Sequence, residues 1–281
     1  MTLVPTADLV AAARAAGTGV LAFNVITIEY AQAIAAAAER AGRPAILQIS
    51  QNAARYHSGV SAIAAATAEV AWRSSATLSL HLDHVEDTTL LEQAADAGFS
   101  SVMVDASTLP YAANVAATRK ATEWAHDHRL WVEAELGYVG GKPDAPASAH
   151  TAGVRTDPAE AARYVAETGV DALAVAVGSS HAMADRTASL DLDLVTAIRD
   201  AVPVPLVLHG SSGVPLEQIR AAVTRGMVKI NVGTALNVAF TDAVRAAVPH
   251  SRDPRRYLAA GRDAVTDNVA RLLTLLPAAR F

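Results

Sequence analysis

Cysteine is absent from this 281-residue chain. Its absence excludes disulfide bonds, zinc sites built on thiolates and catalysis by a cysteine nucleophile. The chain also lacks any run of about 18 uncharged apolar residues, so no membrane-spanning helix is expected. The first residues, Met1 to Pro5, show no basic stretch followed by an apolar core, which argues against a signal peptide. Together these absences predict a cytoplasmic protein.

Positive charge is scarce and scattered. Lys and Arg number 23 against 28 Asp and Glu, which gives a formal net charge of −5. No basic stripe is present, so nucleic acid is not an expected partner. An anionic substrate would have to be held by local backbone and helix-terminus geometry instead. Hydrophobic residues make up 52% of the chain, without low-complexity tracts, as expected of a folded globular protein.

Short apolar runs alternate with longer segments of helical periodicity along the chain. The runs are rich in Val, Leu or Ile, as buried parallel strands are. We expect strands at 19–25, 44–50, 77–84, 101–107, 130–136, 172–178, 205–211 and 227–233. We expect helices at 28–41, 60–73, 88–97, 111–126, 158–168, 191–201, 215–224 and 234–247, with a final helical stretch at 253–276.

Eight β-α repeats without a large insertion favour a closed (β/α)₈ TIM barrel of the α/β class, formed as a single domain over residues 1–281. The alternative is an open doubly wound sheet, which usually has fewer strands and a glycine-rich turn after its first strand. Here Asn24-Val25-Ile26-Thr27 follows the first expected strand and contains no glycine. The closed barrel is therefore the predicted fold.

Polar side chains gather at the carboxyl ends of the expected strands, where barrel enzymes carry their catalytic groups. Such groups are costly inside a barrel unless they are satisfied, so their clustering at one rim predicts a site. His81 has the same side-chain parity as Asp83, and we expect it inside the barrel. The residues at the rim are Asn24, Ser50, Asp83, His84, Asp105, Glu133, Glu135, His181, His209 and Asn231.

Three of the nine histidines, His84, His181 and His209, stand at the ends of three different expected strands. Imidazole is a common zinc ligand, and three protein ligands with one open position make a catalytic zinc site. Each histidine alone could simply hydrogen-bond its neighbours, but three at matching strand ends favour a shared metal ion. We expect the histidines on helices or loops to be solvated: His57, His126, His128, His150 and His250.

Glycine-containing loops follow the last two expected strands. His209-Gly210-Ser211-Ser212-Gly213 leads into one helix, and Asn231-Val232-Gly233-Thr234 leads into the next. N–H groups at helix N-termini attract phosphate, and the loops after strands 7 and 8 are a frequent phosphate site in this fold. One such loop can be only a turn, but two in these positions predict a phosphate site.

These motifs, in this order, resemble the class II, zinc-dependent fructose- and tagatose-bisphosphate aldolases, and the tagatose-bisphosphate branch most closely. The resemblance covers nearly the whole chain and rests on the segments 22–24, 81–84, 102–107, 132–137, 177–181, 208–213, 229–234 and 253–255. It implies a homodimer or homotetramer that reversibly cleaves a ketose phosphate, a small sugar-phosphate substrate, into dihydroxyacetone phosphate and an aldehyde.

The resemblance also implies a role for each site residue. His84, His181 and His209 would bind Zn²⁺, and Asp83 would transfer a proton at the hydroxyl of the cleaved bond. A monovalent cation, Na⁺ or K⁺, often helps to bind the phosphate. The residues that would bind substrate and phosphate are Asn24, Ser50, Ala182, Gly210, Ser212, Asn231, Thr234 and Arg255.

Asp105 and Glu135 resemble residues of a secondary metal site, and Arg255 resembles an arginine that reaches the distal phosphate, which another subunit can supply. Two positions depart from the family pattern. Ala182 stands where the family has a glycine whose N–H binds phosphate; if the backbone there needs a positive φ, alanine costs roughly 1 kcal/mol. Pro143 stands where the family has a loop glutamate that moves a substrate proton, and Asp144 and His150 are the nearest substitutes.

The altered loop leaves alternatives open. One is a divergent aldolase with a different phosphorylated substrate, and another is a barrel that binds zinc and sugar phosphate without turnover. A third is a Schiff-base aldolase, although the chain has only three lysines, of which Lys229 lies in the last expected strand and could face inward. A lysine satisfied inside the barrel is the simpler interpretation of Lys229.

Overall fold

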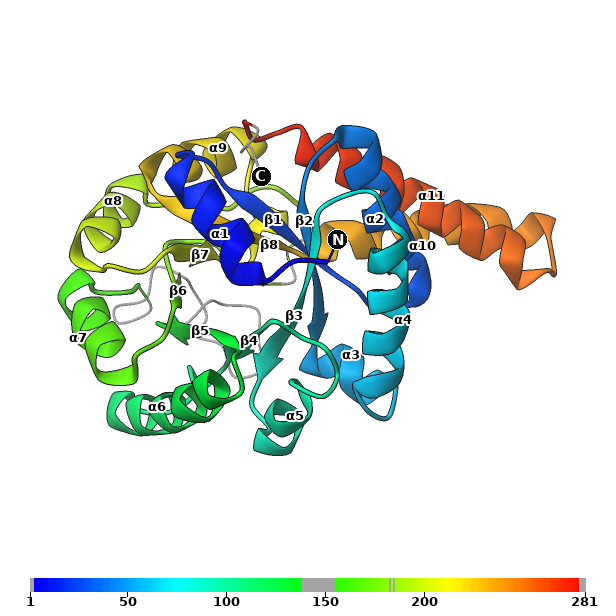
Figure 1. Ribbon diagram of the computed structural model, residues 1–281. Helices are drawn as coiled ribbons and strands as arrows, with labels where there is room; N and C mark the ends of the chain where they lie inside the picture. Colours follow the sequence, from blue (N-terminus) through cyan, green and yellow to red (C-terminus); the bar gives the residue numbers. More distant parts are fainter. Residues whose placement is uncertain (1–2, 138–154, 182, 184, 278–281) are drawn as a thin grey trace.

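The computed structural model of the chain describes residues 3–137, 155–181, 183 and 185–277. Its parallel strands form one closed barrel in chain order, with the last strand paired to the first (Figure 1). The predicted (β/α)₈ TIM barrel is confirmed. The strands are β1 (Val20–Asn24), β2 (Ala45–Ser50), β3 (Leu78–Val85), β4 (Ser101–Val104), β5 (Trp131–Leu136), β6 (Ala172–Val175), β7 (Leu206–Leu208) and β8 (Met227–Val232).

Helices surround the barrel, and the outer parts of the last two project from it (Figure 1). Short 3₁₀ turns occur at Ser211–Gly213 and Val248–His250. The α-helices are α1 (Thr6–Ala15), α2 (Ile28–Ala41), α3 (Gln51–Tyr56), α4 (Ser61–Arg73), α5 (Thr88–Gln93), α6 (Tyr111–Asp127), α7 (Pro158–Thr168), α8 (Leu192–Ala201), α9 (Leu216–Arg225), α10 (Thr234–Ala247) and α11 (Pro254–Leu273). Among the described residues, none of these helices is both long and apolar enough to span a bilayer.

The sequence patterns missed α1 and α3 and extended some elements too far. The sixth strand was expected to reach residue 178 and the seventh residue 211, but β6 ends at Val175 and β7 at Leu208. Gly178 and Gly210 adopt positive φ angles of 118° and 66°, so the chain leaves the extended conformation there. The apolar runs therefore continue past the points where strand pairing stops.

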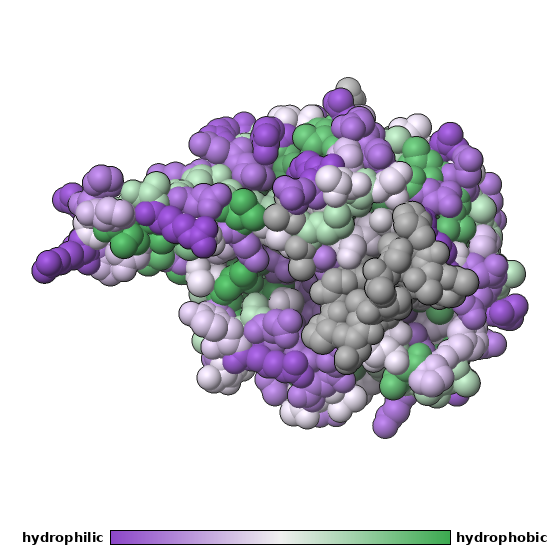
Figure 2. Space-filling view, turned by 180° about the vertical axis from the view of Figure 1, so that it is seen from behind, coloured by the Kyte–Doolittle hydropathy of each residue, from purple (hydrophilic) through white to green (hydrophobic). Residues whose placement is uncertain are grey.

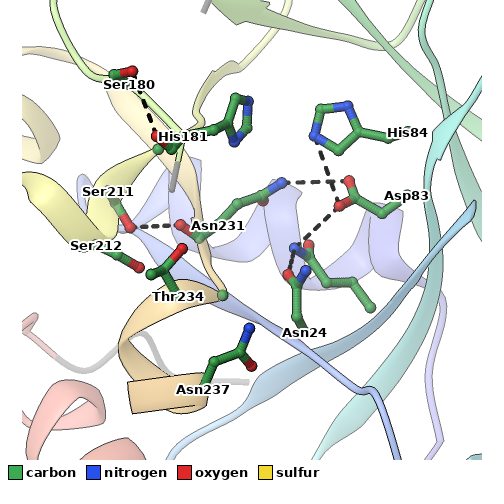
Figure 3. Close-up of a pocket in the computed structure, with 13 residues that line it drawn as sticks. Asn24, Asp83, His84, Ser180, His181, Ser211, Ser212, Asn231, Thr234 and Asn237 are labelled. Carbon is green, nitrogen blue, oxygen red and sulfur yellow. Dashed lines mark hydrogen bonds and ion pairs between the residues drawn. The ribbon is translucent and has the colours of Figure 1, made fainter. Parts of the chain in front are cut away.

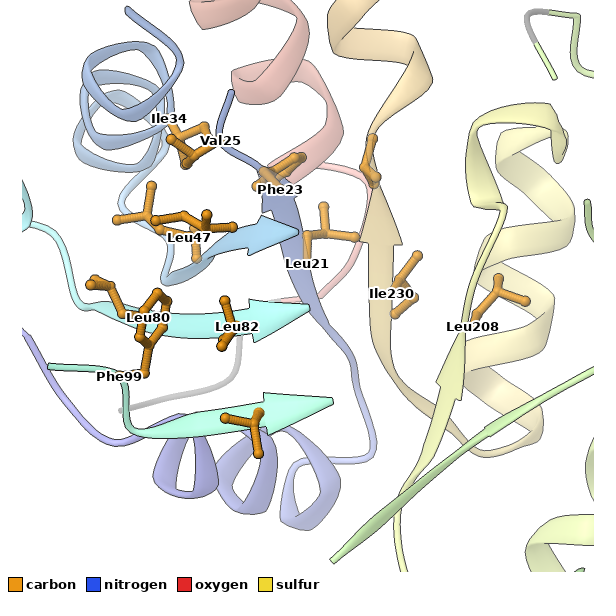
Figure 4. Close-up of a cluster of buried hydrophobic side chains, with 14 of the residues drawn as sticks. Leu21, Phe23, Val25, Ile34, Leu47, Leu80, Leu82, Phe99, Leu208 and Ile230 are labelled. Atoms are coloured by element: carbon orange, nitrogen blue, oxygen red, sulfur yellow. The ribbon is translucent and has the colours of Figure 1, made fainter. Parts of the chain in front are cut away.

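The main core lies between the strands and the helices outside them. Leu21 and Phe23 on β1, Leu47 on β2 and Ile34 of α2 belong to one buried apolar cluster on the outside of the barrel (Figure 4). The α2 face that meets the barrel is rich in fully buried alanine, which allows close approach of helix and sheet. Strand alternation then turns the intervening side chains toward the barrel interior.

Helix α1 seals the amino end of the barrel. Leu9, Val10 and Ala13 are buried there against Ala22 and Ile46 in a small apolar cluster. The hydroxyl of Thr6, also fully buried, donates to Ser79 Oγ at 3.1 Å. With this end closed, the carboxyl ends of the strands form the mouth of the barrel.

Gly178 sets the path of the chain from β6 toward His181. A Cβ at this position would overlap the carbonyl oxygen of Ser189, and φ is 118°. We predict that Gly178→Ala lowers the free energy of unfolding by clearly more than the roughly 1 kcal/mol that a positive φ alone costs alanine. Denaturant titration measures the change.

Gly42→Ala is the matched control for this substitution. Gly42 has a φ of 59°, and nothing lies within 4 Å of a Cβ built there, so only the backbone cost applies. Equal destabilisation by the two variants would contradict the close-contact argument.

Candidate metal centre and active site

A pocket opens at the carboxyl ends of the strands (Figure 3). Many of its lining residues are predicted site residues: Asn24, Asp83, His84, His181, Gly210, Ser212, Asn231 and Thr234. Ser211 and Gly233 belong to the two loops that predicted a phosphate site, whereas Gln48, Ser180 and Asn237 had no predicted role of their own. All come from strand ends, from the loops after them or from the start of α10, as expected of a TIM barrel.

Three imidazoles converge beside this pocket. His84 ends β3, His181 follows β6 and His209 follows β7, and one ring nitrogen of each lies within 4.8 Å of those of the other two. Their ring centroids are 4.9 to 5.8 Å apart. Three imidazole nitrogens with one open side form the donor set of a catalytic zinc ion. The structure thus brings together the residues that the sequence suggested as metal ligands.

A bulge in β3 lets two consecutive residues face the same site. Neighbouring side chains in a strand normally point to opposite faces, so Asp83 and His84 should diverge. The register between β3 and β4 shifts between Leu82 and Val85, and His84 adopts a φ of 52°. Positive φ is uncommon for a residue other than glycine and is often found at functional sites. The bulge directs both side chains to the mouth.

Carboxylates hold two of the imidazoles from behind. Asp105 Oδ2 lies 2.7 Å from His84 Nδ1, and Glu135 Oε2 lies 2.9 Å from His209 Nδ1. Such contacts fix the tautomer and orientation of a metal-binding histidine and raise its basicity. The secondary metal site expected at Asp105 and Glu135 stays a prediction, since in this geometry both residues hydrogen-bond the candidate ligands.

His209 carries a carboxylate on each of its nitrogens. Its Nε2 lies 2.8 Å from Glu133 Oε1, in addition to the Nδ1 contact with Glu135. Burial lowers the pKa of His209, but hydrogen bonds to the two carboxylates outweigh it and raise the pKa to about 9. Metal binding through either nitrogen therefore requires that one contact be released and a proton be lost.

Asp83 is a buried carboxylate within reach of several donors. Gln48 Nε2 lies 3.4 Å from its Oδ2, and Asn231 Nδ2 lies 3.4 Å from its Oδ1. Burial by itself raises the pKa of Asp83, but the charges of His84 and Lys229 and the nearby ring of His81, whose Nε2 lies 3.7 Å from Oδ1, hold it well below its usual range. The group is consequently ionised at neutral pH.

Lys229 is enclosed inside the barrel and lies next to Glu133. Its Nζ lies 2.8 Å from Glu133 Oε2 and donates to Asn231 Oδ1 at 2.7 Å, and neither charged side chain is exposed. The Asn231 amide is thereby oriented with its Nδ2 toward Asp83. Burial raises the pKa of Glu133, but Lys229 and His209 outweigh it and lower the pKa to about 2. A lysine paired in this way is a poor candidate for the Schiff-base nucleophile.

The loops after β7 and β8 form the other wall of the pocket. Gly210 lies against the backbone of Ser180, where a Cβ would come within 2.6 Å of the carbonyl, so only glycine fits without a shift. Ser212 Oγ accepts from the N–H of Ala235 at 3.1 Å, which leaves its own O–H to donate to a ligand. The residues lining the described part of the pocket include no Lys or Arg, so the donors on this wall are neutral.

Several predicted residues lie elsewhere. Ser50 caps α3, where its Oγ accepts from Ala53 N at 3.2 Å, and it does not line the pocket. Arg255 lies on α11 with an 88% exposed side chain and pairs with Asp253. His81 is buried as expected, with Nδ1 2.8 Å from Ser101 Oγ. The remaining predicted positions lie outside the described residues: Ala182, Pro143, Asp144 and His150.

Gln48 and Asn237 are pocket residues to which the sequence analysis gave no role. Gln48 has the same strand parity as Ser50, so a polar side chain directed into the barrel at that position was a usable signal. Asn237 lies one helical turn after Thr234, and its polar character alone does not distinguish it from a solvated helix residue.

Comparison with known proteins agrees with this geometry. A family model described as "Fructose-bisphosphate aldolase class-II" matches residues 4–280. The curated fructose-bisphosphate aldolase of Geobacillus stearothermophilus is 39% identical over 274 residues, covering 96% of this chain and 95% of that protein.

Solved structures show the same fold. The crystal structure of the YdjI aldolase from Escherichia coli K12 matches with a TM-score of 0.87 and 28% identity, covering 99% of this chain and 98% of that one. The fructose-bisphosphate aldolase of Campylobacter jejuni matches with a TM-score of 0.82 at 22% identity, covering 97% and 95% of the two chains, which supports the fold alone.

The carboxylate contact behind His84 generates a prediction. We expect Asp105→Asn to weaken the binding of a divalent cation by about 10–100-fold, because the amide neither fixes the ring tautomer nor raises ring basicity to the same degree. Metal affinity is measured by competition with a chromogenic chelator. Asp171→Asn, at the surface contact with His126, is the control, and an equal loss in both variants would refute the role of Asp105.

Proposed function

The chain belongs to the class-II fructose-bisphosphate aldolase family, and from that premise we propose that it is a zinc-dependent lyase acting on a ketose phosphate. The reaction is reversible aldol cleavage to dihydroxyacetone phosphate and an aldehyde. Residues 1–281 act as one aldolase domain. The observation that carries the proposal is the convergence of three imidazoles beside the ionised Asp83 at the barrel mouth.

The residues present fit a divalent cation. His84, His181 and His209 would hold it, with Asp105 and Glu135 behind two of the rings. A bound cation supplies Lewis-acid stabilisation of the negative charge that develops on the ketone oxygen during cleavage. Three nitrogen donors and the absence of cysteine favour zinc over softer metals. A monovalent cation near the phosphate stays a prediction.

Asp83 would take the proton from one substrate hydroxyl. This hydroxyl is on the carbon whose bond to the neighbouring carbon breaks during cleavage. Its low pKa keeps it ionised at neutral pH, and its adjacency to His84 places it beside the metal ligands. A base must lie within hydrogen-bond reach of the proton that it removes. Asn231 and Gln48 keep the carboxylate in position, since each amide nitrogen lies 3.4 Å from one of its oxygens.

The phosphate of the substrate would bind between the loops after β7 and β8. Gly210, Ser212 and Thr234 line this wall, and Thr234 is the first residue of α10, so the N-terminus of the helix lies at the pocket. Helix N-termini and hydroxyls bind anions without a cationic side chain. Asn24 completes the wall beside Gly233, which lacks a side chain and leaves room for it.

The proposal extends to a dimer or tetramer built on the projecting helices. The α10–α11 arm stands off the barrel and carries apolar side chains among charged ones (Figure 2). Val238 and Val248 are 41% and 47% exposed there, and Leu236 is the only α10 residue classed as buried. Arg255, near the start of α11, does not line its own pocket. In an assembly, it would reach the distal phosphate of the partner's substrate.

The choice between fructose and tagatose substrates, the cytoplasmic location and the identity of a second proton-transfer base stay predictions. The relative from Geobacillus stearothermophilus is named a fructose-bisphosphate aldolase, which makes fructose 1,6-bisphosphate the first substrate to assay. Pro143, in place of the family's loop glutamate, keeps a different phosphorylated substrate open.

Chelation tests the proposed chemistry directly. We expect EDTA to abolish the cleavage of ketose bisphosphates and zinc to restore it, because the cation supplies the stabilisation of developing charge. Borohydride added with dihydroxyacetone phosphate should trap no adduct on Lys229. Cleavage that survives complete removal of metal would refute the proposal, and trapping on Lys229 would support the Schiff-base alternative.

Substitution of Asp83 tests the proton transfer. We expect Asp83→Asn to lower kcat by at least about 10²-fold, the usual contribution of a general base, while zinc content is retained. Asp96→Asn, on an exposed part of the chain, is the matched control. An unchanged kcat in the Asp83 variant would exclude this carboxylate as the base.

A mixing experiment tests whether Arg255 acts across subunits. Arg255→Ala and Asp83→Asn are each expected to be poorly active, but co-expressed chains should recover activity because hybrid assemblies contain one intact site. Recovery measured on tandem-tagged hybrids supports action in trans. A monomer by sedimentation, or hybrids without recovery, would overturn this part of the proposal.

A further inference from the structure

Asn237 lies on the pocket wall, but none of the roles above involves it. We propose that Asn237 is a substrate-binding residue whose amide N–H groups are preset by Tyr30 to donate to the phosphate end of the substrate. This inference rests on the proposed function, since it names a further contact for the same sugar phosphate.

The position of Asn237 follows from its spacing on α10. Thr234 is the first residue of the helix, and residues three apart on a helix lie on one face. Both side chains line the pocket, together with Ser212 of the neighbouring loop (Figure 3). Asn237 therefore extends the row of neutral donors that begins at the helix N-terminus.

The orientation of the amide is fixed from behind. The hydroxyl of Tyr30, on α2, donates to Asn237 Oδ1 at 3.1 Å. Burial raises the pKa of Tyr30 to about 12, so the phenol keeps its proton over the working pH range. With the oxygen of the amide engaged, both hydrogens of its nitrogen remain for a ligand. Figure 3 shows this nitrogen on the side of Asn237 that faces Asn24.

Tyr30 itself is held rigidly. Only 4% of its surface is exposed, and its ring stacks on Phe240 with centroids 5.0 Å apart and an interplanar angle of 30°. Phe240 lies one turn beyond Asn237 on the same helix. Tyr30 thus connects α2 to the first turns of α10, and the amide is ordered before a substrate arrives. Preorganised donors bind without the entropic cost of ordering them.

The charge of the pocket makes this donor important. No Lys or Arg is among the described residues that line it, whereas Asp83 contributes a negative charge. On the described part of this wall, a dianionic phosphate would meet neutral N–H and O–H groups and no cationic side chain. Replacing the amide by a carboxylate would keep the shape and the hydrogen bond from Tyr30, but it would remove the donor and add repulsion.

The test uses the zinc-loaded full chain with dihydroxyacetone phosphate and, separately, inorganic phosphate as probes in calorimetry. We expect Asn237→Ala to raise the Kd for dihydroxyacetone phosphate about tenfold, the effect of losing one hydrogen bond to a charged group. Asn237→Asp should raise it further. In steady-state cleavage, KM should rise in the same order while kcat stays within about threefold, as for a contact made equally in ground and transition states.

Tyr30→Phe separates positioning from direct contact. We expect a smaller rise in Kd than for Asn237→Ala, and no further rise when both substitutions are combined, because the tyrosine acts only through the amide. Asn52→Asp introduces the same change of charge at an exposed position of α3, and it should leave the Kd for dihydroxyacetone phosphate unchanged. Melting temperatures of all variants identify any loss of folding.

The outcomes distinguish this inference from the function on which it rests. A wild-type chain that binds no dihydroxyacetone phosphate would overturn the proposed function. A wild-type chain that binds it, together with folded Asn237→Ala and Asn237→Asp variants of equal affinity, would overturn the role of Asn237 alone. If Asn237→Asp and Asn52→Asp raise the Kd for dihydroxyacetone phosphate equally, long-range electrostatic repulsion explains the effect. This outcome would also contradict the proposal.

Discussion

Lys229 and Glu133 meet inside the barrel, where neither side chain reaches solvent. Removing one member of such a pair strands a buried charge, so both must be present for the fold to tolerate either. Each also holds a residue of the mouth: Glu133 contacts His209, and Lys229 orients Asn231, whose amide nitrogen faces Asp83. The polar residues of the mouth therefore depend on this ion pair for their orientation. Every second residue of a strand points into the barrel, so the ion pair and the mouth residues lie in successive layers of its interior.

The mouth adds local distortion to this regular scaffold. The bulge in β3 and the positive φ of His84 bring consecutive side chains to one site, which an undistorted strand would keep apart. Such strain persists only where the surroundings over-determine it, and here Asp105 holds the ring of His84. The loops after β6 and β7 turn at Gly178 and Gly210, so that their polar residues face the same volume. The regular parts of the strands therefore form the scaffold, and the distorted carboxyl ends of the strands direct the polar side chains to the site.

Much of this arrangement could be predicted from the chain. Eight apolar runs alternating with helical segments predicted the barrel, and the polar residues at their ends placed Asp83 and the three imidazoles at one rim. The contacts between those side chains could not be read in advance. Glu133 pairs with both Lys229 and His209 across the barrel, and no sequence pattern links strands so far apart. Asn237 was missed because helical periodicity does not reveal that Tyr30 lies behind it.

The closure of the amino end of the barrel by α1 affects how ions, water and protons reach the site. Within the described residues, Leu9, Val10 and Ala13 fill that end with apolar side chains. Within the described part of the chain, the pocket at the mouth is therefore the expected route by which ions and water reach the site. The proton that His209 must give up when a cation arrives would leave past the incoming ion. The cation would then enter and the proton would leave through the same opening. The rate of cation binding would depend on the loops at the rim rather than on the barrel.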